Sequence, residues 1–64
     1  MKKYTVYHQN KKTYTRWGWQ GCMRKQENGS LDEVAKKYDA YAEWSVYKVK
    51  DNETGKFVVV PDEN

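Results

Sequence analysis

The segment Ser30–Tyr41, SLDEVAKKYDAY, constrains the fold most, because no other stretch of the chain has a convincing helical pattern. Ser30 precedes Glu33 by three residues, which is the spacing of a capping box at the start of a helix. The pair Asn28-Gly29 just before it is a turn signal. The apolar residues that share one helical face are Leu31, Val34, Ala35, Tyr38 and Ala42. This pattern predicts an amphipathic helix that lies on a sheet.

Two strands are predicted before this helix. They are Lys3–Gln9 and Thr13–Gln20, joined by a short hairpin loop at residues 10–12, and both alternate β-branched or aromatic residues with polar ones. Because Trp17 and Trp19 are the largest apolar pair in the second strand, we expect their face to meet the helix. The residues expected to pack there are Tyr4, Val6, Trp17 and Trp19.

Two more strands are predicted after the helix. Glu43–Lys50 alternates, and we favour Trp44 and Val46 as its inward side chains. Asp51–Gly55 has the composition of a turn, and the fourth strand follows at Lys56–Val60.

The order strand, strand, helix, strand, strand predicts one small α+β domain, residues 1–64, with a frayed tail at 62–64. We expect a mainly antiparallel four-stranded sheet with one helix packed on one face. The element order, the Glu43-Trp44 opening of the third strand and the Asp51…Gly55 hairpin resemble the small bacterial immunoglobulin-binding domains. The resemblance implies a β-grasp arrangement and carries no function, and a different strand order with the same elements stays open.

Charge is unevenly placed along the chain. Residues 1–29 carry seven basic side chains and one acid, a net charge of +6, whereas residues 30–64 carry five basic and eight acidic side chains, a net charge of −3. This asymmetry predicts a basic N-terminal surface that attracts an anionic partner. The alternative is that the charges only keep the protein in solution.

Catalytic and cofactor-binding functions have little support in the sequence. One His and one Cys cannot compose the usual zinc site, and the glycines form no phosphate-binding loop. We therefore expect a protein that is not an enzyme and uses no cofactor or metal. A single Cys favours a reducing compartment, and nothing in the chain is apolar enough to span a membrane, so we expect a cytoplasmic protein without a membrane partner.

The predicted binding site lies on the first hairpin. If Trp17 and Trp19 turn toward the helix, Tyr7 and Tyr14 lie on the opposite face beside Arg16. Exposed aromatic rings stack on bases, and neighbouring cations contact phosphates. The candidate ligand-binding residues are Tyr7, Lys11, Lys12, Tyr14, Arg16, Arg24 and Lys25.

Several partner hypotheses remain open. The basic N-terminal half narrowly favours a nucleic acid or an acidic protein surface. The alternative is a protein–protein interaction module, because Tyr, Trp and Arg are enriched at interaction hot spots. In size and simplicity the chain is similar to small accessory proteins of phages and mobile elements that bind and inhibit one host protein. A third possibility is that Tyr7 and Tyr14 form a cross-strand pair that only stabilises the sheet.

Overall fold

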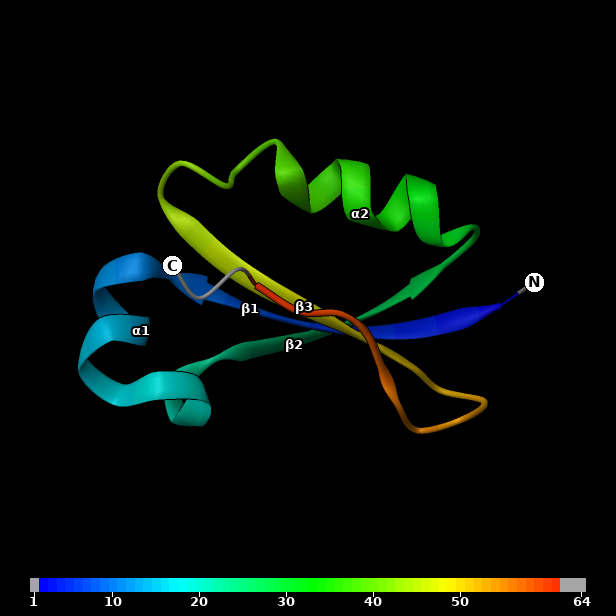
Figure 1. Cartoon of the computed structure of the whole chain (residues 1–64), viewed down its shortest axis with the longest axis horizontal. Coiled ribbons are helices and arrows are strands. Elements are labelled where there is room, and N and C mark those ends of the chain that lie inside the picture. The colour runs from blue at the N-terminus through cyan, green and yellow to red at the C-terminus, as the bar shows by residue number, and fades with distance from the viewer. Residues whose placement is uncertain (1, 62–64) are drawn as a thin grey trace.

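The computed structural model describes residues 2–61 and has an α+β architecture, with a helix packed on one face of a four-stranded antiparallel sheet (Figure 1). The predicted fold class is confirmed. The strand order across the sheet is β2-β1-β3-β4. In chain order the elements are β1 (Lys3–Asn10), α1 (Lys11–Trp17), the 3-10 helix η1 (Gly18–Gly21), β2 (Met23–Asn28), α2 (Leu31–Asp39), β3 (Ser45–Asp51) and β4 (Phe57–Val59).

The first strand, β1, is one of the two inner strands of the sheet because it pairs with both β2 and β3. Val6 lies opposite Lys25 on one side and Val49 on the other, and Val6 and Val49 are fully buried. The β-grasp arrangement pairs its first and last strands in parallel, whereas here β1 pairs with β3 and every pairing is antiparallel. With α1 and η1 set aside, the order strand, strand, helix, strand, strand is as predicted, but the strand order is not that of a β-grasp fold.

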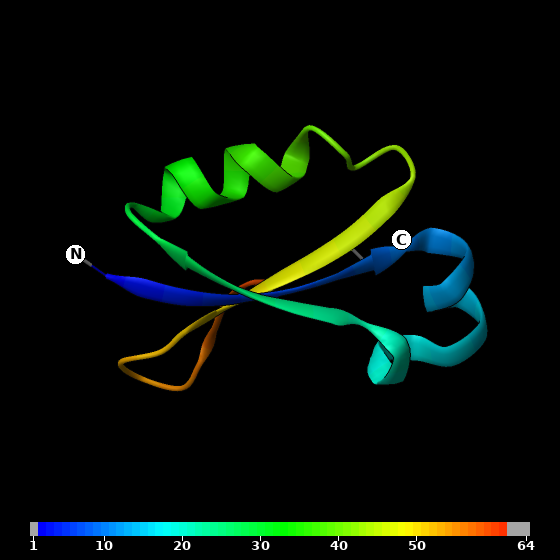
Figure 2. The same cartoon turned by 180° about the vertical axis from the view of Figure 1, so that it is seen from behind.

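The core lies between α2 and the sheet (Figures 1 and 2). Its buried residues are Tyr4, Val6, Val34, Tyr38 and Val49, and those packed around them are Leu31, Tyr47 and Val59. Within α2, the buried residues Val34 and Tyr38 are four positions apart, so both lie on the face that the sequence predicted. Ala42, predicted on the same face, lies beyond the end of α2 and is exposed.

The start of α2 is the one that the capping signal predicts. Ser30 is the N-cap, and its hydroxyl accepts a hydrogen bond from the Glu33 amide at 3.2 Å. Gly29 just before it has a φ of 127°, which a residue with a Cβ rarely adopts. The turn and cap together direct the chain from the edge strand β2 onto the covered face.

Two hydrogen bonds between a tyrosine and a carboxylate connect α2 to the sheet. The Tyr38 hydroxyl donates to Glu27 of β2 at 2.7 Å, and the Tyr47 hydroxyl of β3 donates to Asp39 at the end of α2, also at 2.7 Å. The bond from Tyr38 holds the pKa of the Glu27 carboxyl below its ordinary value, with Lys37 acting in the same direction. Burial and the Asp39 carboxylate raise the pKa of Tyr47 to about 12.

The predicted second strand at residues 13–20 and the hairpin loop at 10–12 are wrong. Residues 11–17 form α1, because the Asn10 side chain accepts from the Lys12 amide at 2.8 Å and thereby caps a helix. Gly18, with a φ of 64°, ends that helix. The second strand of the chain, which pairs with β1, is instead β2, in a segment whose polar composition gave no strand signal.

The predicted inward positions of the tryptophans and Val46 are also wrong. Trp17 and Trp44 are 59% and 54% exposed, and Trp19 is half-buried in η1, outside the α2 core. In β3 the side chains that face α2 are Tyr47 and Val49, so half-buried Val46 belongs to the opposite face. The turn after β3 and the fourth strand appear where predicted, with β4 shorter than expected.

The other side of the sheet carries no helix comparable to α2 within residues 2–61, and α1 and η1 continue from the end of β1 beyond the sheet (Figures 1 and 2). No described helix has the length and apolar character needed to cross a membrane. The tail predicted at residues 62–64 lies outside the described residues.

Candidate functional site

The side of the sheet that faces away from α2, here called the open face, gathers aromatic and basic side chains. Strand register accounts for this: Tyr7 in β1 lies opposite Arg24 in β2 and Lys48 in β3. All three point away from the core because they alternate with residues such as Val6 and Val49 that face α2. The open-face cluster consists of Tyr7, Trp19, Arg24, Lys48, Lys50 and Phe57.

Lys48 is at the centre of this cluster. Its ammonium lies 4.4 Å from the ring centre of Trp19, 4.5 Å from that of Phe57 and 5.4 Å from that of Tyr7. The rings of Tyr7 and Phe57 are themselves in tilted contact, with 5.6 Å between their centres. Three aromatic rings from β1, η1 and β4 therefore surround one cation, which is attracted to the negative ring faces.

Two further cations border the Tyr7 ring. The Arg24 guanidinium lies 6.0 Å from its centre and the Lys50 ammonium 5.8 Å. Among residues 2–61, the ion pairs involve Lys2 and Lys37 as the basic partners, and the three open-face cations take part in none of them. Their charge is therefore available to an anionic ligand.

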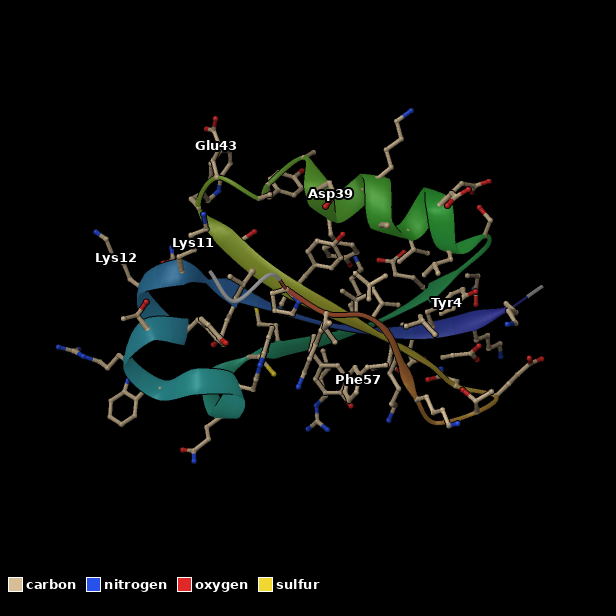
Figure 3. The ribbon with its side chains drawn as sticks, in the orientation of Figure 1. Tyr4, Lys11, Lys12, Asp39, Glu43 and Phe57 are labelled. Carbon is tan, nitrogen blue, oxygen red and sulfur yellow. The ribbon has the colours of Figure 1, made fainter. Side chains whose placement is uncertain are left out.

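The aromatic rings at the open face remain accessible to solvent. Phe57 is 43% exposed, a large fraction for an apolar ring, and Figure 3 shows it on the opposite side of the sheet from Asp39 and α2. Tyr7 and Trp19 are half-buried, so each ring is held by its neighbours while part of it stays open. Partly buried rings of this kind have defined orientations and lose little conformational freedom on binding.

Trp19 reaches the open face because η1 is anchored to the sheet. The amide nitrogen of the buried Gln9 side chain donates to the Gly18 carbonyl at the junction of α1 and η1. On the other side the Tyr14 ring packs against Trp19, with 5.0 Å between the ring centres. Trp19 is thus held between α1 and the Lys48 ammonium.

A closed ring of three polar side chains borders the cluster on the same face. The Thr5 hydroxyl donates to Asn52 at 2.7 Å, the Asn52 amide donates to Gln26 at 2.9 Å, and the Gln26 amide donates back to Thr5 at 3.0 Å. These residues come from β1, the β3–β4 turn and β2. The ring therefore joins three separate segments and stiffens the surface on which Tyr7 lies.

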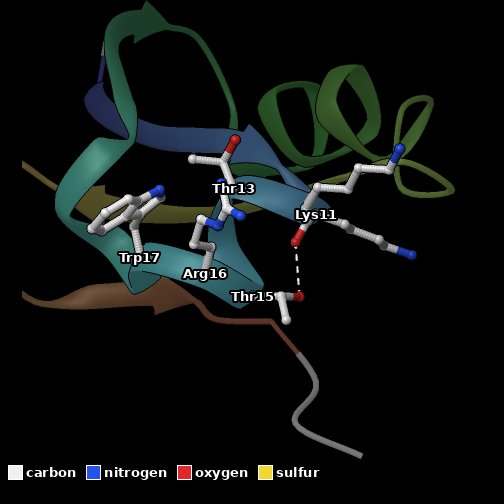
Figure 4. A pocket seen from close by; sticks show the side chains of 6 residues that line it. Lys11, Thr13, Thr15, Arg16 and Trp17 are labelled. Atoms are coloured by element: carbon white, nitrogen blue, oxygen red, sulfur yellow. Dashed lines mark hydrogen bonds between the residues drawn. The ribbon is translucent and has the colours of Figure 1, made fainter.

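Helix α1 carries a second basic surface next to the cluster. A shallow hollow of about 700 Å³ lies on it, and Figure 4 shows the side chains around this hollow. The Thr15 hydroxyl donates to the Lys11 carbonyl at 2.9 Å, which is a bond within the helix. The residues that line the hollow are Lys11, Lys12, Thr13, Thr15, Arg16 and Trp17.

The seven candidate residues from the sequence fall into three groups. Tyr7 and Arg24 come together on the open face, as predicted. Lys11, Lys12, Tyr14 and Arg16 belong to α1, so a cross-strand pair between Tyr7 and Tyr14 does not exist. Lys25 lies opposite Val6 on the side of α2, in a hollow shared with Tyr38 and Trp44.

Sequence reasoning missed four residues of the cluster, namely Trp19, Lys48, Lys50 and Phe57. A signal for the two lysines was present, because Val46, Lys48 and Lys50 share one face of β3 while Tyr47 and Val49 share the other. The face of β3 that carries two lysines is the one more expected to be exposed to solvent. Trp19 could not be found in this way, because its position depends on where η1 packs.

This arrangement is suited to binding. Within residues 2–61, no three His, Cys, Asp or Glu side chains lie close enough together to hold a metal ion. The open face offers aromatic rings for stacking and cations for anionic groups. No family model, no curated protein and no solved structure matches the chain.

Proposed function

We propose that the protein is a non-catalytic binding module whose open face binds single-stranded nucleic acid. The observation that carries the proposal is the grouping of Trp19, Phe57 and Tyr7 around Lys48, with further cations beside it. Proteins that bind single strands combine a positively charged surface with aromatic side chains on which bases stack. Both components come together here on one accessible face.

Stacking supplies affinity without requiring a particular sequence. A base that stacks on an aromatic side chain contributes about 1–3 kcal/mol. Phe57 and Tyr7 are 5.6 Å apart between ring centres and tilted by 58°, so one base does not cover both rings in parallel. We expect two successive bases to use them, with Trp19 available to a third.

The lysine at the centre has two roles in this proposal. In the free protein the Lys48 ammonium occupies the ring faces of Trp19 and Phe57. A base that stacks on either ring displaces the ammonium, and the flexible lysine stem lets it swing toward the adjacent phosphate. The ammonium therefore exchanges its contact with the rings for a contact with a phosphate, so that ligand binding does not leave this charge without an interaction.

A single strand fits this face better than a duplex. In a duplex the bases are stacked on each other, and only their edges are accessible in the grooves. Aromatic rings on a sheet surface instead need bases that are unstacked and splayed out, as they are in single strands and loops. A basic patch alone would favour both ligands, whereas the exposed rings favour the single strand.

Matched alanine variants test the proposal. Phe57→Ala removes an exposed ring from the open face, and Trp44→Ala removes an exposed ring from the side of α2. We expect Phe57→Ala to weaken binding of a labelled twelve-nucleotide oligo-dT by roughly 5- to 150-fold, the equivalent of one stacked base. Trp44→Ala should bind like the wild type in the same fluorescence anisotropy assay. Equal effects of the two variants, or equal affinity for the strand and its duplex, contradict the proposal.

The second candidate is a protein partner, and an observation on the other side of the molecule favours it. Tyr41 and Trp44 are 52% and 54% exposed and form an edge-to-face pair with 6.0 Å between ring centres. Exposed Tyr and Trp are the residue types enriched at interaction hot spots. An interaction module of the host-inhibitor type would use this pair. The wild type would then capture one protein, and this binding would persist at high salt. Trp44→Ala would abolish the capture, whereas Phe57→Ala would leave it unchanged.

A further inference from the structure

We infer that the surface of α1 is a second contact region for the same nucleic-acid strand, which it holds by its phosphates after the bases have stacked on the open face. This inference rests on the proposed function and extends it. It assigns a role to Lys11, Lys12 and Arg16, which the structure places outside the open-face cluster.

The charge of α1 and η1 has a single sign. Residues 11–22 contain three basic side chains and no acid. Lys11, Lys12 and Arg16 are exposed, and none of them takes part in the ion pairs found within residues 2–61. Three exposed cations on seven residues create a positive potential, which attracts anionic groups such as phosphates and does not attract a neutral or basic ligand.

Trp17 adds an aromatic group to this charge. Its side chain is 59% exposed at the rim of the hollow formed with Lys12 and Arg16 (Figure 4). An exposed tryptophan leaves a large apolar surface in contact with water, because its side chain is among those with the largest apolar area. Stacking on a base removes that surface from water. The neighbouring cations then lie beside the phosphate of the same nucleotide.

The α1 surface is continuous with the open face. The Tyr14 ring of α1 packs on Trp19, and Trp19 in turn contacts Lys48 in the open-face cluster. A strand that leaves the cluster past Trp19 therefore comes next to α1. The longest dimension of the molecule is 34 Å. Twelve nucleotides span about 40 Å even at the rise of a stacked helix, which is enough to cover both regions.

The position of α1 is fixed before any ligand binds. The Lys11 amide donates to the Trp44 carbonyl at 3.0 Å, and the Asn10 side chain caps the helix through the Lys12 amide. Gln9 holds the other end through the Gly18 carbonyl. Because these bonds use backbone atoms of residues 11, 12 and 18, the side chains of Lys12 and Arg16 can be replaced without removing them.

Strand length separates the two regions experimentally. Oligo-dT of four and of twelve nucleotides is titrated into the wild type and the variants Arg16→Gln, Lys12→Gln and Lys36→Gln at several salt concentrations. Lys36→Gln is the matched control, because it removes one positive charge from the exposed side of α2. NMR titration measures the weak short ligand, and fluorescence anisotropy measures the long one.

We expect the logarithm of the association constant for the tetranucleotide to fall with the logarithm of salt concentration with a slope of about −2, from three open-face contacts. The twelve-nucleotide strand should have a slope of about −4, and Arg16→Gln or Lys12→Gln should reduce its magnitude by about 0.7 each. Neither variant should change tetranucleotide binding, and Lys36→Gln should change neither ligand.

The outcomes distinguish this inference from the proposed function. If both strands bind and the α1 variants match Lys36→Gln on the long strand, α1 makes no contact. The inference is then overturned while the open-face proposal stands. If neither strand binds at low salt, both are overturned. If the α1 variants lose affinity equally for the short and the long strand, α1 belongs to the primary site. That result also contradicts a separate second region.

Discussion

The Lys48 ammonium lies 4.4 Å from the ring centre of Trp19, and this contact joins the 3-10 turn after α1 to the middle of the sheet. Trp19 belongs to η1, outside the sheet, and the ring of Tyr14 in α1 packs against it as well. The lysine thus orders an aromatic ring in the free protein and supplies a positive charge to the face that we propose as the binding site.

Replacing this lysine should affect ligand binding more than folding. Lys48→Met keeps an unbranched stem against the rings and removes the charge. We expect the free energy of unfolding to change by less than about 1 kcal/mol, the upper range for a solvent-accessible cation–π contact. The salt slope for oligo-dT binding should become shallower by about 0.7. Lys56→Met, an exposed lysine before β4, is the control and should keep the wild-type slope. A wild-type slope in Lys48→Met would contradict its contact with a phosphate.

Stability should depend on valines more than on tryptophans. Val6 is fully buried beneath α2, whereas Trp17 is 59% exposed on α1. We expect Val6→Ala to lower the free energy of unfolding by roughly 2 kcal/mol through lost burial and the remaining cavity. Trp17→Ala should lower it by less than about 0.5 kcal/mol. Urea denaturation followed by far-UV circular dichroism measures both. A larger loss for Trp17→Ala would mean that α1 packs differently.

Of the two glycines in η1, Gly18 and Gly21, only Gly18 should be required by the backbone conformation. Gly18 has a φ of 64° and open space where a Cβ would lie, so Gly18→Ala creates backbone strain without a clash. We expect it to cost about 1–2 kcal/mol. At Gly21, which has no positive φ, a Cβ would meet the Thr13 methyl at 3.4 Å, an ordinary contact. Gly21→Ala should therefore be nearly neutral in the same denaturation assay, and equal losses would contradict the described backbone.

Acid should weaken the attachment of α2 through Glu27. The Tyr38 hydroxyl stabilises the Glu27 carboxylate, so the folded-state pKa of this carboxyl lies below its ordinary value of 4.5. A carboxyl of this kind contributes stability above its unfolded pKa and loses that contribution as pH falls through the folded pKa. We expect the melting temperature of Glu27→Gln to fall less than that of the wild type between pH 7 and pH 3. Glu43→Gln, at an exposed acid labelled in Figure 3, should follow the wild-type curve. Parallel curves for Glu27→Gln and the wild type would contradict the role of this bond.

The parts of the fold that the sequence predicted correctly are those determined by local signals. Ser30 and Glu33 set the start of α2, and the spacing of Val34 and Tyr38 set its buried face. The turn at residues 51–55 contains Gly55, whose φ of 74° explains why glycine is found there. In each case the residues that specify the element lie inside it or directly next to it in the chain.

The incorrect parts depend on packing between distant segments. Residues 13–20 alternate aromatic and polar side chains, which predicted a strand, but the cap at Asn10 and the stop at Gly18 favour a helix. The polar segment 23–28 became β2 because its backbone pairs with β1 over six positions, from Lys3↔Asn28 to His8↔Met23. As an edge strand it needs few apolar residues, so pairing outweighed its weak strand propensity.

The candidate site was predictable only in part for the same reason. Tyr7 and Arg24 were found because the alternation within β1 placed Tyr7 away from Val6, and Arg24 belongs to the basic half. Phe57 lies beside them because β4 pairs with β3. This pairing brings the rings of Phe57 and Tyr7, which are 50 positions apart in the chain, into contact. No local pattern contains that information.

The most direct test of the central claim is a map of amide chemical shifts as a single-stranded oligonucleotide is added to isotopically labelled protein at low and moderate salt. We expect salt-sensitive amide shifts at Tyr7, Trp19, Arg24, Lys48 and Phe57. Side-chain proton spectra from the same titration should show a downfield change of the Lys48 Hε protons as bases replace the ammonium over the rings. The amides around Trp44 on the side of α2 should stay in place. Shifts confined to the α2 side, or no shifts at low salt, would contradict the claim that the open face binds nucleic acid.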